Sequence, residues 1–541
     1  MKKIHIYIPL LLGIAAAIGI FIGGKLNFTD TSDRIFATNS KKDKLNRLID
    51  YIDYEYVEDV NTDSIVDVTV NGILSNLDPH SVYIPKENFQ KVRESMKGGF
   101  VGVGISFYTF KDTITVIRSI KNGPSAKAGI KGGDRILTVN GDTIINKGLD
   151  NDALVNKIKG PIDTYVNLGV YRKSSNQFLN FKLKRSTIPL KSVDASYMLT
   201  DELGYIKLNR FAESSYKEFI SALKNLKSNG AQRLVLDLRD NPGGFVGVAS
   251  EIIDEFLVDK KLILYTKNKR NKIEKTFATD KGIFENGYVY VLINENSASA
   301  SEILAGALQD NDLGTIVGRR SYGKGLVQRE MQLGDGSAVR LTVSKYYTPT
   351  GRSIQRAYEK GNTDYFDDYY NRINSGELTD ETKIEVADSL KFTTPKGKVV
   401  YGGGGIIPDI FVPVDKGMNN QTLEFIEKRG LTSNFVFELL EENRQAYFGF
   451  TQDEFISNYT IEDIVVKKFE KFLQEKTQSN IVFVAYRQEV KHYIKANIAE
   501  QLFGDEAYSK VLSKYDNMIE KILSIENPIL EELESNIQED N

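Results

Sequence analysis

A strand that passes straight into a helix through a turn of small, hydroxyl-bearing residues constrains the fold of this chain most. The apolar run 288–293 is typical of a buried strand, and residues 303–309 have the pattern of a helix. Ser-Ala-Ser-Ala-Ser-Glu, residues 297–302, joins the two. Because the free N–H groups of a helix N-terminus favour negative charge, a serine in such a turn can serve as a nucleophile.

Strand and helix patterns alternate over residues 191–415. Residues 204–208 and 234–238 are apolar enough for strands, and each run is followed by apolar residues at helical spacing. These residues are Phe219, Ile220, Leu223 and Leu226 after the first run, and Val248, Ile252, Ile253 and Phe256 after the second. The alternation predicts a layered α/β sheet, and a chain of 541 residues is long enough for several domains.

The residue inventory leaves a serine few partners for catalysis. There are no cysteines, which excludes a thiol nucleophile, a Cys-ligated zinc site and disulfides. None of the three histidines forms a pair with metalloprotease spacing. A Ser-His-Asp triad would have to recruit His80 or His492 from segments that the pattern indicates are separate.

A lysine offers another base. Lys324 stands between Gly323 and Gly325, and its amine can accept a serine proton if burial lowers its pKa toward neutrality. Gln328 lies where it could hydrogen-bond the amine and orient it, which is the role of the third group in a triad. We therefore pair Ser299 with Lys324.

The sequence DLRDNPGG, residues 237–244, supplies the remaining part of a hydrolytic site. Without a Cβ, Gly243 and Gly244 can expose backbone N–H groups that would hold an oxyanion. The second donor would be the N–H of Ala300. Taken singly, these motifs are usually a solvated lysine, a turn and a helix N-cap; it is their combination and order that favour a catalytic site.

A glycine-rich β segment covers residues 96–190. Alternating strand patterns at 105–110 and 113–117 precede GDRILTVNG, residues 133–141, and this order resembles a PDZ domain. The resemblance implies that one loop offers N–H groups to a peptide C-terminal carboxylate while the peptide adds as a strand. That loop would be Gly102, Val103, Gly104 and Ile105. The alternative is a β-domain whose glycines only make turns.

Several segments together resemble the carboxy-terminal processing, or tail-specific, peptidases. Besides the PDZ-like segment, they are SASASEILAGALQDN (297–311), SYGKGLVQ (321–328), DLRDNPGG (237–244) and LDPHSVYIP (77–85). The resemblance covers about residues 45–415. It implies a Ser-Lys endopeptidase with a crotonase-like α/β core in a multidomain chain, without a metal or cofactor.

The resemblance also assigns residues. It implies that Ser299, rather than Ser297 or Ser301, is the nucleophile, that Lys324 is the base and that Gln328 assists it. Supporting positions are expected at Glu302, Asp310 and Ser321. Where many family members carry an acidic residue before the lysine motif, this chain has Arg319 and Arg320. Their charges would help to deprotonate Lys324 if they lie close to it; otherwise they point to solvent.

The N-terminus favours export. Lys2 and Lys3 precede the apolar run 4–24, which as a helix would span about 31 Å, close to the thickness of the bilayer core. We expect residues 1–25 to be an uncleaved anchor, with a cleaved signal peptide as the alternative. Either places the rest of the chain outside the cytoplasm, in the periplasm of a bacterial cell envelope or secreted. The formal net charge of −3 gives no nucleic-acid footprint.

The remaining segments are a linker with a helical segment at 26–95 and a helical C-terminal region at 416–541. An apolar helix such as 435–440 could pack within the chain or across a dimer. The resemblance implies protein substrates captured by apolar C-terminal tails, and an adaptor protein is left open. Alternatives are a catalytically silent PDZ scaffold or chaperone, a trypsin-like PDZ protease, for which residues 191–415 lack a histidine, and a crotonase-type acyl-CoA enzyme.

Overall fold

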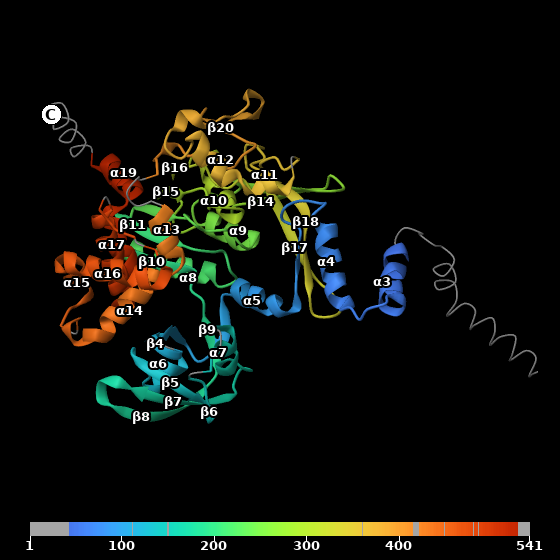
Figure 1. Ribbon diagram of the computed structural model, residues 1–541. Helices are drawn as coiled ribbons and strands as arrows, with labels where there is room; N and C mark the ends of the chain where they lie inside the picture. The colour runs from blue at the N-terminus through green and yellow to red at the C-terminus, as the bar shows by residue number, and fades with distance from the viewer. Residues whose placement is uncertain are drawn as a thin grey trace, which may run out of the picture. The chain divides into compact units, whose positions relative to one another are not determined.

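The computed structural model describes residues 43–527 except 111, 146, 149, 150, 360, 415–420, 448, 480 and 485 (Figure 1). The expected anchor or signal at 1–25 and the linker that follows it lie outside the described residues. Within the described residues, no helix is long and apolar enough to cross a membrane. The chain divides into two compact units, residues 1–77 and 78–541.

The first unit contains two helices, α3 (Asp43–Glu55) and α4 (Thr62–Leu74). Asn61 begins α4 as its N-cap, because its side chain accepts a hydrogen bond from the Ser64 amide at 3.0 Å. Thr62 also donates to Asp53 of α3 at 2.7 Å, which joins the two helices.

The centre of the second unit is a six-stranded sheet in the order β10-β11-β12-β15-β16-β21. Only β10 is antiparallel to its neighbour. The strands are β10 (Val193–Met198), β11 (Leu203–Leu208), β12 (Arg233–Asp237), β15 (Tyr288–Ile293), β16 (Gly314–Gly318) and β21 (Ile410–Phe411). This confirms the predicted strands at 204–208, 234–238 and 288–293 to within a residue, and their continuous apolar runs fit a parallel sheet covered on both faces.

Helices α8 (Ser215–Ser228), α9 (Val246–Asp254) and α10 (Ala300–Asp310) cover one face of this sheet, and α19 (Asn517–Glu526) covers the other. Every residue of α10 is buried. A helix buried on all sides must have small or apolar residues all round, which the Ala- and Gly-rich sequence of α10 provides.

A second, antiparallel sheet carries the lysine segment. Its strands are β1 (Val82–Ile84), β13 (Leu262–Asn268), β14 (Ile273–Phe277), β17 (Leu326–Gln332) and β18 (Ala338–Tyr347). Because β1 pairs with β18, residues 82–84 belong structurally with the sheet of the core, although the sequence pattern grouped them with the N-terminal helical segment. Lys324 lies just before β17.

Residues 99–189 form a β-domain with its own apolar core. Helix α5 (Lys86–Lys97) leads into it, and the antiparallel pair β2 (Gly99–Gly102) and β9 (Ser186–Pro189) encloses the rest. Between them lie β3 (Ile105–Phe110), β4 (Thr113–Ser119), α6 (Pro124–Ala128), β5 (Asp134–Val139), β6 (Asp142–Thr143), α7 (Asn151–Ile158), β7 (Tyr165–Arg172) and β8 (Gln177–Lys184).

The C-terminal region is helical, with an aromatic-rich core. Its helices are α13 (Gln421–Lys428), α14 (Leu431–Asn443), α15 (Gln452–Asn458), α16 (Asp463–Thr477), α17 (Arg487–Phe503), α18 (Asp505–Leu512) and α19. Phe435 and Leu440 of α14 are buried within the chain. Between the core and this region lie α11 (Asn362–Phe366), α12 (Asp368–Ser375), β19 (Lys391–Thr393) and β20 (Val399–Tyr401), and the short 3-10 turns are 173–175, 381–383, 388–390, 444–447 and 513–515.

Candidate active site

Ser299 occupies the turn between β15 and α10 in a sparsely populated backbone conformation, φ 54° and ψ −111°. For a residue other than glycine such a conformation is costly and is typical of functional turns. The hydroxyls of Ser297 and Ser301 are buried and donate to the Leu238 and Asn241 carbonyls at 2.8 and 2.9 Å. Of the three serines, Ser299 alone keeps a partly exposed side chain.

The carboxylate of Glu302 joins the serine turn to the lysine segment. One oxygen accepts from the Ser299 and Lys324 amides at 2.8 and 2.9 Å. The other accepts from the Ser321 hydroxyl and the Gly323 amide at 2.5 and 2.6 Å. Four donors fill the lone-pair sites of an ionised carboxylate, so this fully buried group is satisfied. Burial raises the pKa of Glu302, and the four donors act in the opposite direction.

Close packing explains the glycines beside Lys324. A Cβ on Gly323, whose φ is 90°, would approach Gly404 and Gly405 backbone atoms to 3.2 Å, and one on Gly325 would approach the Gln355 amide to 2.9 Å. The phenol of buried Tyr346 lies 3.1 Å from the Ser299 carbonyl oxygen and 2.8 Å from that of Lys324. Ser299 and Lys324 are therefore held together through their backbones.

The amine of Lys324 lies in a half-buried site on the rim of the second sheet. Burial lowers its pKa to about 8; the Arg340 charge acts in the same direction, and Glu302 and Asp78 oppose it. The Lys324 Nζ donates to Gln328 Oε1 at 2.9 Å, the hydrogen bond that the sequence analysis expected. Gln328 in turn donates to the His80 carbonyl, which fixes the orientation of its amide.

Sequence reasoning did not assign roles to the residues that hold His80. Asp78 accepts from the His80 and Ser81 amides, both at 3.0 Å, and from the Thr342 hydroxyl at 3.0 Å, so the loop is tied to β18. The His80 Nε2 lies 2.7 Å from the Tyr365 hydroxyl. Burial, with a contribution from Lys324, lowers the pKa of His80 to about 4, so its ring is neutral. The LDPHS motif was the signal that could have identified this loop.

Of the expected oxyanion donors, Ala300 directly follows Ser299, Gly243 packs against the serine turn, and Gly244 packs against the Phe211 backbone. A Cβ on Gly243, φ 98°, would come within 2.8 Å of the Ala300 nitrogen, so only glycine allows this approach. The Gly243 amide donates to Asn241 Oδ1 at 2.9 Å. Among the hydrogen bonds of the described residues, the Gly244 and Ala300 amides have no acceptor. Of the two glycines, Gly244 is therefore the one with a free donor.

The other expected supporting residues have structural contacts. Asp310 pairs with Arg352 at 2.7 Å, both side chains fully buried, and accepts from the Thr350 amide and hydroxyl. The Ser321 hydroxyl donates to Glu302 and accepts from the Ile406 amide at 2.6 Å. These contacts fix the C-terminal end of α10 and the start of the lysine segment.

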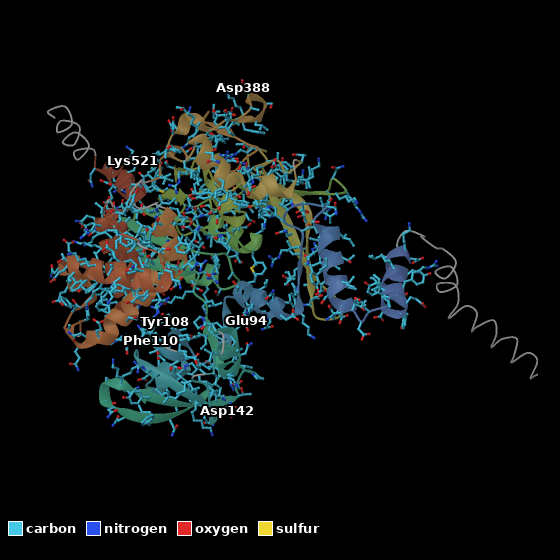
Figure 2. The ribbon with its side chains drawn as sticks, in the orientation of Figure 1. Glu94, Tyr108, Phe110, Asp142, Asp388 and Lys521 are labelled. Atoms are coloured by element: carbon cyan, nitrogen blue, oxygen red, sulfur yellow. The ribbon has the colours of Figure 1, made fainter. Side chains whose placement is uncertain are left out.

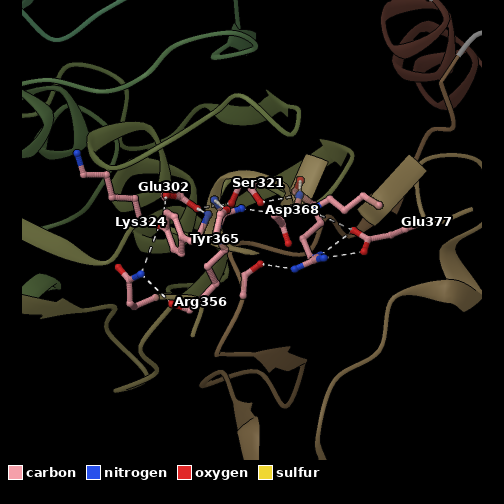
Figure 3. A network of polar contacts seen from close by, with 12 residues as sticks. Glu302, Ser321, Lys324, Arg356, Tyr365, Asp368 and Glu377 are labelled. Carbon is pink, nitrogen blue, oxygen red and sulfur yellow. Dashed lines mark hydrogen bonds and ion pairs between the residues drawn. The ribbon is translucent and has the colours of Figure 1, made fainter. Parts of the chain in front are cut away.

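Arg319 and Arg320 are each paired with a carboxylate and do not point to open solvent. Arg319 pairs with Glu295 at 2.9 Å. Arg320 binds both oxygens of Glu377 at 2.7 and 2.6 Å, and the cation that lowers the Lys324 pKa is Arg340. Figure 3 shows this polar network, with Glu302 and Ser321 beside Lys324 and Glu377 at its other end.

The network continues through an arginine between two rings. The guanidinium carbon of Arg356 lies 4.2 Å from the Tyr322 ring centroid and 4.0 Å from that of Tyr365, and Arg356 pairs with Asp368 at 2.5 Å (Figure 3). Cation–π contacts of this kind hold Tyr365 against His80. The described residues include no group of three or more His, Asp or Glu placed to hold a metal ion.

The loop expected to bind a peptide carboxylate borders a groove of about 300 Å³. Gly102, Val103, Gly104 and Ile105 line it together with Phe107 and, from α7, Val155 and Ile158. Helix α5 forms part of the wall, and Glu94 of α5 pairs with Lys159 at 3.0 Å. The groove is mainly apolar with charged groups at its edge, which suits a peptide end with an apolar last side chain.

Three segments of the sequence match models of known protein families. Residues 202–361 match the model of peptidase family S41, residues 101–183 match the PDZ domain, and residues 423–504 match a family of unknown function (DUF8443). The carboxy-terminal-processing protease of Bartonella bacilliformis is 35% identical over 62% of this chain and 78% of its own length. The carboxy-terminal processing protease CtpB of Bacillus subtilis is 34% identical over 58% of this chain and 65% of its own length.

Among solved structures, the photosystem II D1 C-terminal processing protease is similar over 68% of this chain and 86% of its own, at 24% identity and a TM-score of 0.36. The chain belongs to the S41 family of carboxy-terminal processing serine proteases, with an S41 peptidase core, a PDZ domain and a helical C-terminal region.

Proposed function

We propose that Ser299 and Lys324 act as a Ser-Lys dyad that hydrolyses peptide bonds. The neutral Lys324 amine accepts the proton of the Ser299 hydroxyl as Ser299 Oγ attacks the scissile carbonyl carbon. The Ala300 and Gly244 amides donate to the oxyanion. Lys324 then gives its proton to the leaving amine, and water, activated by the same amine, hydrolyses the acyl-enzyme and regenerates Ser299.

One observation carries the proposal. The Lys324 amine combines a pKa lowered to about 8 with a fixed direction, because Gln328 accepts from it at 2.9 Å. A general base works best when its pKa lies near the operating pH and its geometry is set beforehand. The shared carboxylate of Glu302 supports the same pairing by binding the amides of Ser299 and Lys324.

The PDZ domain would select the substrate. A C-terminal carboxylate would meet the amides of 102–105, and an apolar last side chain would enter the groove beside Phe107 and Val155. If residues 1–25 anchor or export the chain, the substrates are exported or envelope proteins. This location is a proposal from the sequence of the N-terminus alone.

The test is cleavage of an unfolded protein that ends in apolar residues, with residues 26–541 as the enzyme. We expect Ser299→Ala and Lys324→Ala each to reduce kcat/KM by about 10³-fold or more without unfolding the protein. The matched controls are Ser228→Ala and Lys224→Ala on the exposed side of α8. A substrate copy with a charged tail should be cleaved more slowly.

A silent scaffold would give a different result. It would bind the tail without cleaving it, and a serine-reactive phosphonate would not label Ser299. Cleavage that persists in both dyad variants would contradict the proposed chemistry, while equal cleavage of apolar and charged tails would contradict the proposed role of the PDZ domain.

A further inference from the structure

The helical C-terminal region contacts the PDZ domain as well as the peptidase core. Tyr108 and Phe110 of β3 lie where the PDZ domain faces α14 (Figure 2). Most of this region matches a family of unknown function, so its contacts are the best guide to what it does.

An aromatic anchor lies at the centre of the contact. Phe437 of α14 is 0% exposed, and its ring centroid lies 5.6 Å from that of Tyr108, edge-on, and 6.4 Å from that of Phe110. Its neighbours Phe435, Val436 and Leu440 belong instead to the apolar core of the C-terminal helices. Phe437 therefore packs against the rings of the PDZ domain rather than in that core, and a buried aromatic ring of this kind is typical of an interface hot spot.

Charged side chains lie next to Phe437, on one side of it. Glu441 of α14 lies 3.5 Å from the Arg135 guanidinium, and the Lys173 amine lies 3.4 Å from the Glu441 carbonyl oxygen. The turn at Gly132 and Gly133 permits this approach, because a Cβ on Gly133 would lie 2.9 Å from a Glu441 carboxylate oxygen.

A second group of charges joins the PDZ domain to the C-terminal helices. Arg118 of β4 hydrogen-bonds Asp505 at the start of α18 and lies 3.8 Å from Glu500 of α17. Burial chiefly raises the pKa of Glu500, the Arg118 charge lowers it, and the charges of Asp505 and of Asp194 in the core raise it further. Removal of Arg118 would leave carboxylates facing one another without this cation.

The same region is firmly attached to the core. Met518, Ile519 and Ile522 of α19 are buried against the central sheet. Asp516 pairs with Arg239 of the core at 2.6 Å, and Glu526 accepts from the Tyr290 hydroxyl at 2.6 Å. By contrast, the chain enters and leaves the PDZ domain through the two-stranded β2–β9 ribbon, which is too small to be stable by itself. Helix α5 adds two ion pairs to the PDZ domain, Glu94–Lys159 at 3.0 Å and Lys91–Asp152 at 2.9 Å, and the side chains of both pairs are at least partly exposed.

We infer that the helical C-terminal region is a brace that fixes the PDZ domain to the peptidase core, with Phe437 as its apolar anchor and Asp505 and Glu441 as its polar partners. The brace sets where the PDZ groove lies relative to Ser299. This goes beyond the proposed function and does not depend on it, because it concerns domain position in the absence of substrate.

The chain is free of cysteine, so two engineered cysteines can carry spin labels without background. We would place them by Ser174→Cys on the PDZ domain and Ser228→Cys on the core, both exposed, in the full chain. Pulsed electron–electron double resonance then measures the distribution of distances between the two spin labels. The unmodified brace should give a single narrow distribution.

Two variants should broaden this distribution of distances between the spin labels. Phe437→Ala should lower the ratio of docked to undocked PDZ domain by roughly 30-fold, as for an interface hot spot. Arg118→Glu should lower it by about fivefold to tenfold, and adding Asp505→Arg should recover part of that loss by restoring an opposite-charge pair. Lys127→Glu, an exposed PDZ residue with the same charge change, should leave the distribution narrow.

Distributions that stay narrow in both Phe437→Ala and Arg118→Glu would overturn the inference. So would an Arg118→Glu, Asp505→Arg chain that is no better docked than Arg118→Glu alone. Thermal unfolding of each variant separates undocking from loss of fold, and if Phe437→Ala does not fold, the charge exchange decides the question. Because no substrate is present, failure of the proposed peptidase chemistry would not alter any of these results.

Discussion

The polar contacts of the proposed catalytic centre and those of the PDZ junction differ in burial. Around Ser299, one fully buried carboxylate, that of Glu302, has every lone-pair site occupied by a donor from the two segments it joins. At the junction, Arg118 and its partners Glu500 and Asp505 each keep about a third of their side-chain surface exposed. Loss of a donor leaves the buried carboxylate unsatisfied, whereas water can replace a lost partner at the junction.

The difference follows from dielectric environment. Loss of one partner from a buried charged group costs about 3–5 kcal/mol, because water cannot reach the remaining charge to take the place of the lost partner. Exposed ion pairs contribute about 0–1 kcal/mol, because water competes for both charges. A rigid centre suits chemistry that depends on sub-ångström geometry, and a weaker junction suits a domain that must admit a substrate tail.

Outside the dyad itself, the largest effect should come from Glu302→Gln, which breaks the carboxylate that joins the two segments. The amide oxygen can still accept from Ser321 and Gly323, but the NH₂ group would face the amides of Ser299 and Lys324, which are also donors. We expect kcat/KM to fall by about 100-fold or more, and the free energy of unfolding by about 1–3 kcal/mol. Denaturant unfolding and cleavage kinetics measure the two effects.

Glu285→Gln, a partly exposed side chain in the loop before β15, is the control for the same chemical change. Full activity in Glu302→Gln would show that the dyad does not need the shared carboxylate, and would contradict the account of the centre given above.

A smaller effect is expected from Gln328→Leu, which retains the fold of β17 but removes the acceptor for Lys324. The amine would keep its burial and lose its fixed direction, so we expect kcat to fall roughly tenfold to 100-fold with KM nearly unchanged. Gln332→Leu at the exposed end of the same strand is the control. A loss in KM alone would assign Gln328 to substrate binding instead.

The PDZ groove should respond through binding. Val155→Asp puts a carboxylate beside the apolar part of the groove, and we expect KM for a substrate with an apolar tail to rise about tenfold. Asn156→Asp adds the same charge on the exposed side of α7 and should leave KM unchanged. If both variants behave alike, net charge rather than the groove governs recognition.

Local sequence patterns predicted the parts of the centre that lie on one strand or in one turn. The β15–α10 junction and the Lys324–Gln328 hydrogen bond follow from a buried apolar run and from spacing along the chain. The lowered pKa of Lys324 depends on Arg340 and on burial by segments distant in sequence, so no local pattern carries it. Arg319 and Arg320 show the same limit, because only the folded chain reveals Glu295 and Glu377 as their partners.

The contacts of the C-terminal region are also beyond local reasoning. Phe437 has the same type of side chain as Phe435 two residues earlier, yet one packs on the PDZ domain and the other in the core of the C-terminal helices. An apolar stripe indicates that a helix face is covered, and only the arrangement of domains determines what covers it.

The smallest expected effect concerns the protonation of Lys324, and the pH dependence of kcat/KM measures it. In the proposed mechanism the neutral amine of Lys324 is the active form, so kcat/KM should fall as pH drops through its pKa of about 8. The Arg340 charge disfavours the protonated amine, so Arg340→Gln should raise the pKa of Lys324 and move the profile to higher pH, with activity at pH 7 lower by about twofold and the alkaline plateau unchanged. Arg329→Gln, on the exposed side of β17, should leave the profile in place. A profile that moves equally in both variants would mean that general surface charge, rather than the neighbour of the amine, sets the pKa at the catalytic centre.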